Sequence, residues 1–166
     1  MIVAGVDLAV VRPTAVAVLE ECDLLYLALA SSDEEVVWTA LLFKPRAVAI
    51  DAPLTAPEGG RGLRDVETQL RRLGYRLLPP MMGGMKDLTL RGIRLSKSMS
   101  ADVVEVHPTT SLKAMGLSRR DVERRYGVKQ KDLVDAIVAA LTALAYVRGD
   151  YKRFGPFVLP TSRVCL

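Results

Sequence analysis

Four short apolar segments that each carry or lead into a carboxylate constrain the fold of this chain most. They are Val3–Asp7, Ala47–Asp51, Val103–Glu105 and Lys131–Ala136. The first three have the continuous apolar character of buried strands, where an ionised carboxylate is costly unless something compensates its charge. Four such acids at the ends of elements in a small chain predict one shared acidic cluster. The simplest compensation for that cluster is a divalent cation.

The composition indicates one globular domain with a substantial core, since 50% of the 166 residues are hydrophobic and 25% are charged. No apolar run approaches the roughly 20 residues that span a bilayer. The first residues also lack the basic region of a signal peptide. We therefore predict a cytoplasmic protein without a membrane partner.

The two cysteines, Cys22 and Cys165, lie far apart and form no Cys-x-x-Cys pattern. Neither a thiolate zinc site nor a disulfide framework is therefore expected. Cys22 and the single tryptophan, Trp38, are expected to lie in the core.

Alternating apolar runs and turn residues predict five strands, with short connections that favour an antiparallel meander for the first three. A helix precedes the fourth strand, and a long apolar helix that follows the fifth is expected to pack against the sheet. The strands are expected at residues 2–10, 14–19, 24–29, 47–50 and 102–106, and these two helices at 34–43 and 131–148.

Residues 52–100 read as a basic loop-and-helix insertion within one domain that spans residues 1–166. Between Arg61 and Lys97 there are nine basic and three acidic residues, a net charge of +6, whereas the whole chain carries only +4. This distribution favours an anionic partner such as nucleic acid. The candidates for phosphate contact are Arg61, Arg64 and Arg91, because guanidinium groups match phosphate geometry. The only histidine, His107, is a further candidate for substrate contact.

The order of elements resembles the ribonuclease H-like fold, here expected as a mixed five-stranded sheet, with three antiparallel strands plus two parallel ones, flanked by helices. In that superfamily, metal ligands come from the first strand, the fourth strand and the last helix. The resemblance assigns these positions to Asp7, Asp51 and the pair Asp132 and Asp135. The Asp-x-x-Asp-Ala pattern of the last helix is similar to that of Holliday-junction resolvases. Glu105, at the end of the fifth strand, is an additional candidate.

A second resemblance covers nearly the whole chain. It rests on the motifs Gly5-x-Asp7-Leu8-Ala9, Arg12-Pro13-Thr14, Ile50-Asp51-Ala52-Pro53-Leu54, Arg64-Asp65, Pro79-Pro80, Arg91-Gly92, Glu105-Val106-His107-Pro108 and Asp132-x-x-Asp135-Ala136. Together these motifs resemble the family called domain of unknown function 429, which is described as predicted nucleases of the ribonuclease H fold.

The leading hypothesis is therefore a nuclease that depends on Mg²⁺ or Mn²⁺, since oxygen-rich sites select such hard cations. Two ions about 3.5–4 Å apart can activate water and stabilise the leaving oxygen of a phosphodiester. The expected catalytic residues are Asp7, Asp51, Glu105 and Asp135, and Asp132 is expected to join them as a metal ligand.

Two alternatives remain at this point. The first is a non-catalytic nucleic-acid-binding domain of the same fold. The second is a nucleotide-dependent phosphotransferase, because sugar kinases and actin share the core and its first-strand aspartate. Those proteins need two lobes and a glycine-rich phosphate hairpin, whereas the first hairpin here, Val10–Thr14, has no glycine. Because resolvases of this fold act as dimers, a homodimer is a further expectation.

Overall fold

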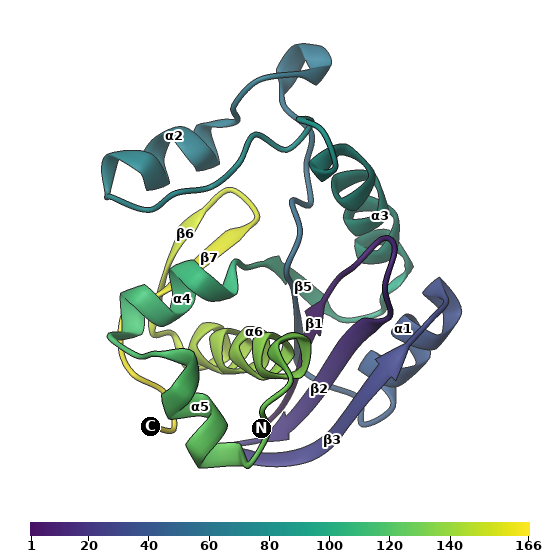
Figure 1. Cartoon of the computed structure of the whole chain (residues 1–166), viewed down its shortest axis with the longest axis vertical. Helices are drawn as coiled ribbons and strands as arrows, with labels where there is room; N and C mark the ends of the chain where they lie inside the picture. Colours follow the sequence, from purple (N-terminus) through teal and green to yellow (C-terminus); the bar gives the residue numbers. More distant parts are fainter.

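The computed structural model describes residues 1–166 and contains one mixed sheet of seven strands in the order β3-β2-β1-β4-β5-β7-β6 (Figure 1). The strands are β1 (Ile2–Asp7), β2 (Thr14–Glu20), β3 (Asp23–Ala30), β4 (Ala47–Ile50), β5 (Asp102–Glu105), β6 (Tyr151–Phe154) and β7 (Phe157–Pro160). The helices are α1 (Asp33–Leu41), α2 (Asp65–Arg72), α3 (Met85–Ser98), α4 (Pro108–Met115), α5 (Arg119–Tyr126) and α6 (Lys131–Arg148), with a short 3-10 turn at Glu58–Gly60.

The first five strands have the predicted arrangement. Strands β1, β2 and β3 form the antiparallel meander, β4 runs parallel to β1, and β5 runs parallel to β4. The register between β1 and β4 ends with Val6 opposite Ile50. The carboxyl ends of these two central strands therefore meet at one edge of the sheet, and the next residue of each strand is an aspartate.

The expected five strands are too few, because β7 and β6 extend the sheet beyond β5. Strand β7 pairs in parallel with β5, and β6 closes the sheet as an antiparallel edge strand. All four residues of β7 are buried, so this short apolar run is an internal strand. Strand β6 is half-exposed and only four residues long, which explains why its sequence carries little strand signal.

Helices cover both faces of the sheet. Helices α4, α5 and α6 share the larger core with one face, and α1 and α3 share a second core with the other. Figure 1 shows α6 crossing the sheet beside β1 and β2, while α2 lies apart at the upper end of the molecule. This layering leaves the carboxyl ends of β1 and β4 between α6 and the insertion.

Two glycines allow this close packing around the strand ends. A Cβ atom on Gly5 of β1 would lie 2.2 Å from the backbone oxygen of Ala136 and 2.2 Å from the backbone nitrogen of Ala140. Helix α6 therefore rests directly on the backbone of β1. On the opposite side, a Cβ atom on Gly92 of α3 would lie 2.9 Å from the carbonyl oxygen of Pro53. The two helices thus approach the acidic end of the sheet from both sides.

The expected absence of a disulfide and the expected burial of Trp38 are wrong, whereas Cys22 packs against the core. Cys22 and Cys165 form a disulfide with their Cα atoms 5.3 Å apart, which joins the β2–β3 turn to the C-terminal tail. A separation of 143 residues without a spacing pattern gives no sequence signal for this pairing. Trp38 lies on the outer side of α1 and is 62% exposed. No helix is both long enough and apolar enough to cross a membrane, and the cytoplasmic location stays a prediction.

Candidate active site

Asp7 and Asp51 form a pair of carboxylates at the ends of the adjacent parallel strands β1 and β4. The backbone N–H of Asp51 donates to the carbonyl oxygen of Val6 at 2.9 Å, which extends the ladder between the strands by one residue. The two carboxyl groups share a hydrogen bond. Asp7 is only 4% exposed, and the salt bridges of this region go to other acids. The pair therefore lacks a cationic partner.

This environment favours the protonated forms of both acids. Burial raises the pKa of Asp7 to about 7, and its hydrogen bond with Asp51 offsets part of that rise. Burial also raises the pKa of Asp51 well above its ordinary value, and the negative charge of Asp7 adds to the rise. Two carboxylates this close cannot both ionise without a cost, so the pair retains a proton near neutral pH.

Asp132 and Asp135 project from the first turns of α6 toward the same cluster, and their charges raise the pKa of Asp7. Both are neutralised by basic side chains. The Nε of Arg12 donates to Asp132 at 2.9 Å. The Nε of Arg119 donates to Asp135 at 2.8 Å, and the Nζ of Lys131 donates to it at 3.2 Å. The structure thus brings the four predicted aspartates together at one edge of the sheet. Asp7 and Asp51 form no salt bridge, whereas Asp132 and Asp135 each pair with basic side chains.

The donor chemistry of this cluster fits a hard divalent cation, although the present rotamers do not converge on one. No three Asp, Glu, His or Cys side chains surround a common point closely enough to hold an ion. Asp7 and Asp51, however, offer oxygens that form no salt bridge, and the charges of Arg12 and Lys131 offset the effect of burial only in part. A third carboxylate ligand requires Asp135 or Asp132 to exchange its basic partner for the ion. The positions thus fit a metal site.

Glu105 is not brought into this cluster, and the structure gives it a different partner. It pairs in register with Ile50 rather than with Asp51, and successive residues of a strand point to opposite faces. Its carboxylate accepts hydrogen bonds from the backbone N–H of Leu54 at 2.8 Å and from Arg64 at 2.8 and 2.7 Å. Burial raises the pKa of Glu105, and Arg64 offsets part of the rise. Its direct role is to hold the start of the insertion.

Arg64 does not fit the predicted role in phosphate contact. It is only 8% exposed, and its guanidinium donates to Glu67, Glu105 and the hydroxyl of Thr55. A buried guanidinium with its donors engaged by two carboxylates is a structural cross-link between α2 and β5. The sequence could not distinguish it from the exposed arginines of the same run.

The other three residues predicted to contact substrate differ in their exposure and in the hydrogen bonds that they already form. Arg61 is exposed. Arg91 donates to Asp33 at 2.8 Å and to the carbonyl oxygen of Ala9, so it ties α3 to α1 and to the β1–β2 loop. His107 precedes α4, with its Nδ1 2.7 Å from the hydroxyl of Thr110. Burial lowers the pKa of His107, which favours the neutral imidazole.

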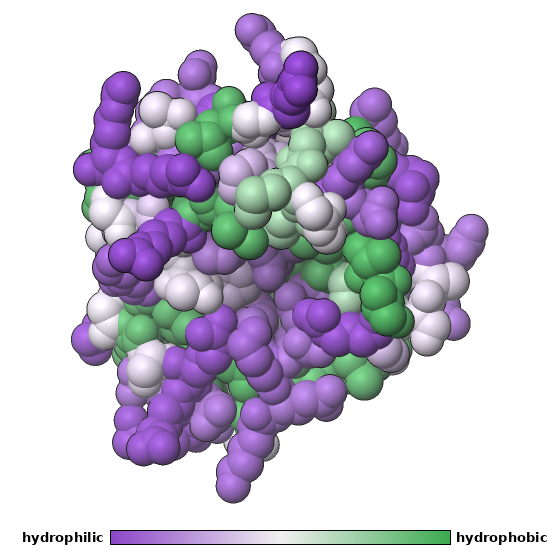
Figure 2. Space-filling model, turned by 45° about the horizontal axis from the view of Figure 1, so that its top comes forward, coloured by the Kyte–Doolittle hydropathy of each residue, from purple (hydrophilic) through white to green (hydrophobic).

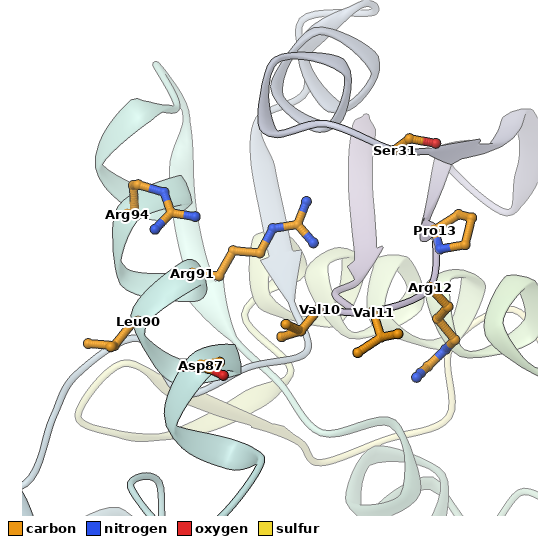
Figure 3. Close-up of a pocket in the computed structure, with 9 residues that line it drawn as sticks. All are labelled: Val10, Val11, Arg12, Pro13, Ser31, Asp87, Leu90, Arg91 and Arg94. Atoms are coloured by element: carbon orange, nitrogen blue, oxygen red, sulfur yellow. The ribbon is translucent and has the colours of Figure 1, made fainter.

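A polar groove of about 510 Å³ lies between the β1–β2 loop and α3 (Figure 3). Its basic side chains are Arg12, Arg91 and Arg94, and Figure 3 shows the last two extending side by side from α3. Because Arg12 also binds Asp132, the groove adjoins the acidic cluster. Arg12, Arg94 and Arg119 were not among the residues predicted from the sequence to contact substrate. The position of Arg12 in the loop directly after the strand of Asp7 is the one signal that could have found it.

The sequence matches no family model and no curated protein. Two solved structures of Thermus thermophilus RuvC are similar in fold. The structure in complex with a Holliday junction substrate has a TM-score of 0.56 at 17% identity, and the alignment covers 96% of this chain and 99% of that chain. A second RuvC structure has a TM-score of 0.52 at 16% identity, with the same coverage. These similarities identify the ribonuclease H-like fold, which confirms the predicted fold class.

Proposed function

We propose that this chain is a nuclease that hydrolyses phosphodiesters of nucleic acid with the help of Mg²⁺ or Mn²⁺. The observation that carries the proposal is the Asp7–Asp51 pair, two carboxyl groups without a salt bridge at the ends of adjacent parallel strands. Such a pair is costly without a cation. The similarity in fold to RuvC, solved with a junction substrate, supports nucleic acid as the partner.

Asp7 and Asp51 would hold the metal, and Asp135 or Asp132 would complete its shell. Bound there, the ion supplies Lewis acidity to the phosphodiester and lowers the pKa of a water molecule. The protein itself provides the fixed position of the two carboxylates. It also provides Arg12 and Arg119, whose guanidinium groups become free to bind phosphate when the acids leave them. We do not include Glu105 among the ligands, because its register with Ile50 turns its side chain away from the acidic pair and toward Arg64.

The groove of Figure 3 is the proposed track for the phosphate backbone. Arg12 and Arg94 are well exposed at its rim, with 58% and 60% of their side chains accessible. Contacts of exposed basic side chains with phosphates release counterions, so binding should weaken steeply as salt rises. Arg61 on the insertion is a further candidate contact.

A non-catalytic nucleic-acid-binding domain is the second candidate, and one observation favours it. Asp132 and Asp135 are already neutralised by Arg12, Arg119 and Lys131, so the metal must compete with three basic side chains. If these ion pairs persist with substrate, the cluster holds the fold together and catalyses nothing.

The test is cleavage of a labelled panel of single strands, duplexes, an RNA–DNA hybrid and a four-way junction, with Mg²⁺, Mn²⁺ or chelator. The variant Asp51→Asn removes one proposed ligand. Asp150→Asn is the matched control, because Asp150 is exposed and forms no salt bridge. Metal-dependent cleavage by the wild type and by the control, with none by Asp51→Asn, is the expected result. Salt-sensitive binding without cleavage in all three proteins would support the binding domain instead.

Membership of the domain of unknown function 429 family, assembly as a homodimer and a cytoplasmic location are also part of our proposal. The family rests on the sequence motifs, the homodimer on the resemblance to resolvases, and the location on composition.

A further inference from the structure

A small cavity of about 200 Å³ opens beside Asp51, under the insertion. One part of its lining is apolar and comes largely from the insertion, including Leu77, Leu78, Met85 and Leu88. Figure 2 shows one face of the molecule, on which hydrophobic side chains gather beside a hydrophilic hollow. Asp51 of the acidic pair lines the cavity, and the proposed reaction assigns no role to the rest of its lining.

The other part of the lining is polar. It consists of Asp51, Arg64, Glu67, Glu105 and His107, of which Arg64 and Glu67 belong to the insertion. One oxygen of Glu105, Oε2, accepts a single hydrogen bond, from Arg64 at 2.7 Å, and a carboxylate oxygen has room for a second donor. His107 uses Nδ1 toward Thr110, which leaves Nε2 for another partner. The cavity therefore has apolar side chains in one part of its lining and polar side chains in the other.

We propose that this cavity receives one unstacked nucleobase of the substrate strand, next to the phosphate at Asp7 and Asp51. The inference rests on the proposed function, since it specifies the substrate of that same site. The volume is below the roughly 300 Å³ at which pockets for drug-sized ligands begin, so a single planar ring fits and a base pair does not. The substrate must therefore have an unpaired or easily unpaired nucleotide at the site of reaction.

The chemistry of the lining also indicates which edge of the base is recognised. A carboxylate accepts hydrogen bonds, as Glu does from the amino group of cytosine. Glu105 is therefore suited to a base edge that carries N–H donors. The flexible thioether of Met85 and the half-exposed Leu78 adapt to rings of different size.

The first measurement tests the cavity without metal or cleavage. Cytidine and ribose are titrated separately into the ¹⁵N-labelled full chain in the presence of chelator. Cytidine is expected to shift the amide resonances of Ala52, Leu54 and residues 105–107 at concentrations at which ribose shifts none. Equal effects of cytidine and ribose would overturn the proposal.

Matched tryptophan variants test the location. Leu78→Trp places a bulky ring at the cavity, whereas Leu73→Trp alters a leucine of similar exposure, 55% against 57%, that does not line it. Cytidine binding should be lost in Leu78→Trp and retained in Leu73→Trp. Met85→Ala, which removes part of the apolar wall, should weaken binding. Unchanged binding in both cavity variants would overturn the proposal.

A second measurement connects the cavity to a strand. Oligodeoxycytidylate is compared with an abasic oligomer of the same length, and removal of the bases should weaken binding by roughly tenfold because ring contacts contribute to affinity. Leu78→Trp should reduce that difference. Base-dependent binding without cleavage anywhere in the panel would refute the proposed nuclease while supporting the base site. Cleavage without base-dependent binding would have the opposite meaning.

Discussion

Replacement of Asp7 by asparagine is expected to stabilise the metal-free protein at about pH 8 and to change it little at about pH 4. Burial raises the pKa of Asp7 from 3.8 to about 7 in the folded state. Between these values the native state keeps a proton that the unfolded state has released. The free energy of unfolding contributed by this group is therefore greatest below the unfolded pKa and falls as pH rises through about 7.

The magnitude follows from the size of the shift. A rise of about three pH units at about 1.36 kcal/mol each corresponds to about 4 kcal/mol lost above the folded pKa. Asparagine has no proton to lose, and its amide can still donate to Asp51. Removing the charge of Asp7 also relieves Asp51, whose pKa that charge raises. We expect Asp7→Asn to gain about 3 kcal/mol over the wild type at about pH 8.

Urea unfolding in chelator, with the disulfide kept oxidised, measures this difference across the pH range. Asp150→Asn serves as control and should follow the wild type. The reasoning is refuted if Asp7→Asn and the wild type keep the same pH dependence. A second contradicting result is a gain in the free energy of unfolding at high pH of no more than about 0.5 kcal/mol, which is the effect of an ordinary surface substitution.

Three other substitutions or treatments test parts of the fold. Glu105→Gln should lower the free energy of unfolding by about 3 kcal/mol, because it leaves the buried guanidinium of Arg64 without its main countercharge; a variant that loses only activity would restore Glu105 to the catalytic set. Gly5→Ala should destabilise by about 3 kcal/mol or more through overpacking against α6, whereas Gly84→Ala, with nothing within 4 Å of the new Cβ atom, should be nearly neutral; thermal unfolding compares them. Reduction of the disulfide should cost about 3 kcal/mol, measured by urea unfolding with and without reductant, and an unchanged midpoint would contradict a stabilising role for the Cys22–Cys165 pairing.

The central aspartates were predictable because their position follows from elementary sheet geometry. Two apolar strands that run parallel end at one edge, so Asp7 and Asp51 had to become neighbours once β1 and β4 paired. The same reasoning failed for Glu105. Its strand ends at the same edge, but its register with Ile50 turns its side chain to the other face. Register depends on pairing partners that one sequence does not reveal.

The features that the sequence did not indicate depend on long-range contacts. Arg12 meets an aspartate 120 residues away, and the disulfide spans 143 residues. No local pattern records such distances. Arg64 was misinterpreted for a related reason, because an arginine that is buried by tertiary packing looks, in sequence, like its solvated neighbours.

The disulfide makes the chain nearly a closed ring. Residues 22–165 form a covalent loop, and only residues 1–21, which contain β1 and β2, and Leu166 lie outside it. A protease that cuts once within the insertion, for example near the exposed Gly59 and Gly60, opens the ring but releases no fragment. Such a nicked molecule keeps both halves of the acidic cluster on one covalent body. It would separate into two pieces on a denaturing gel only after reduction.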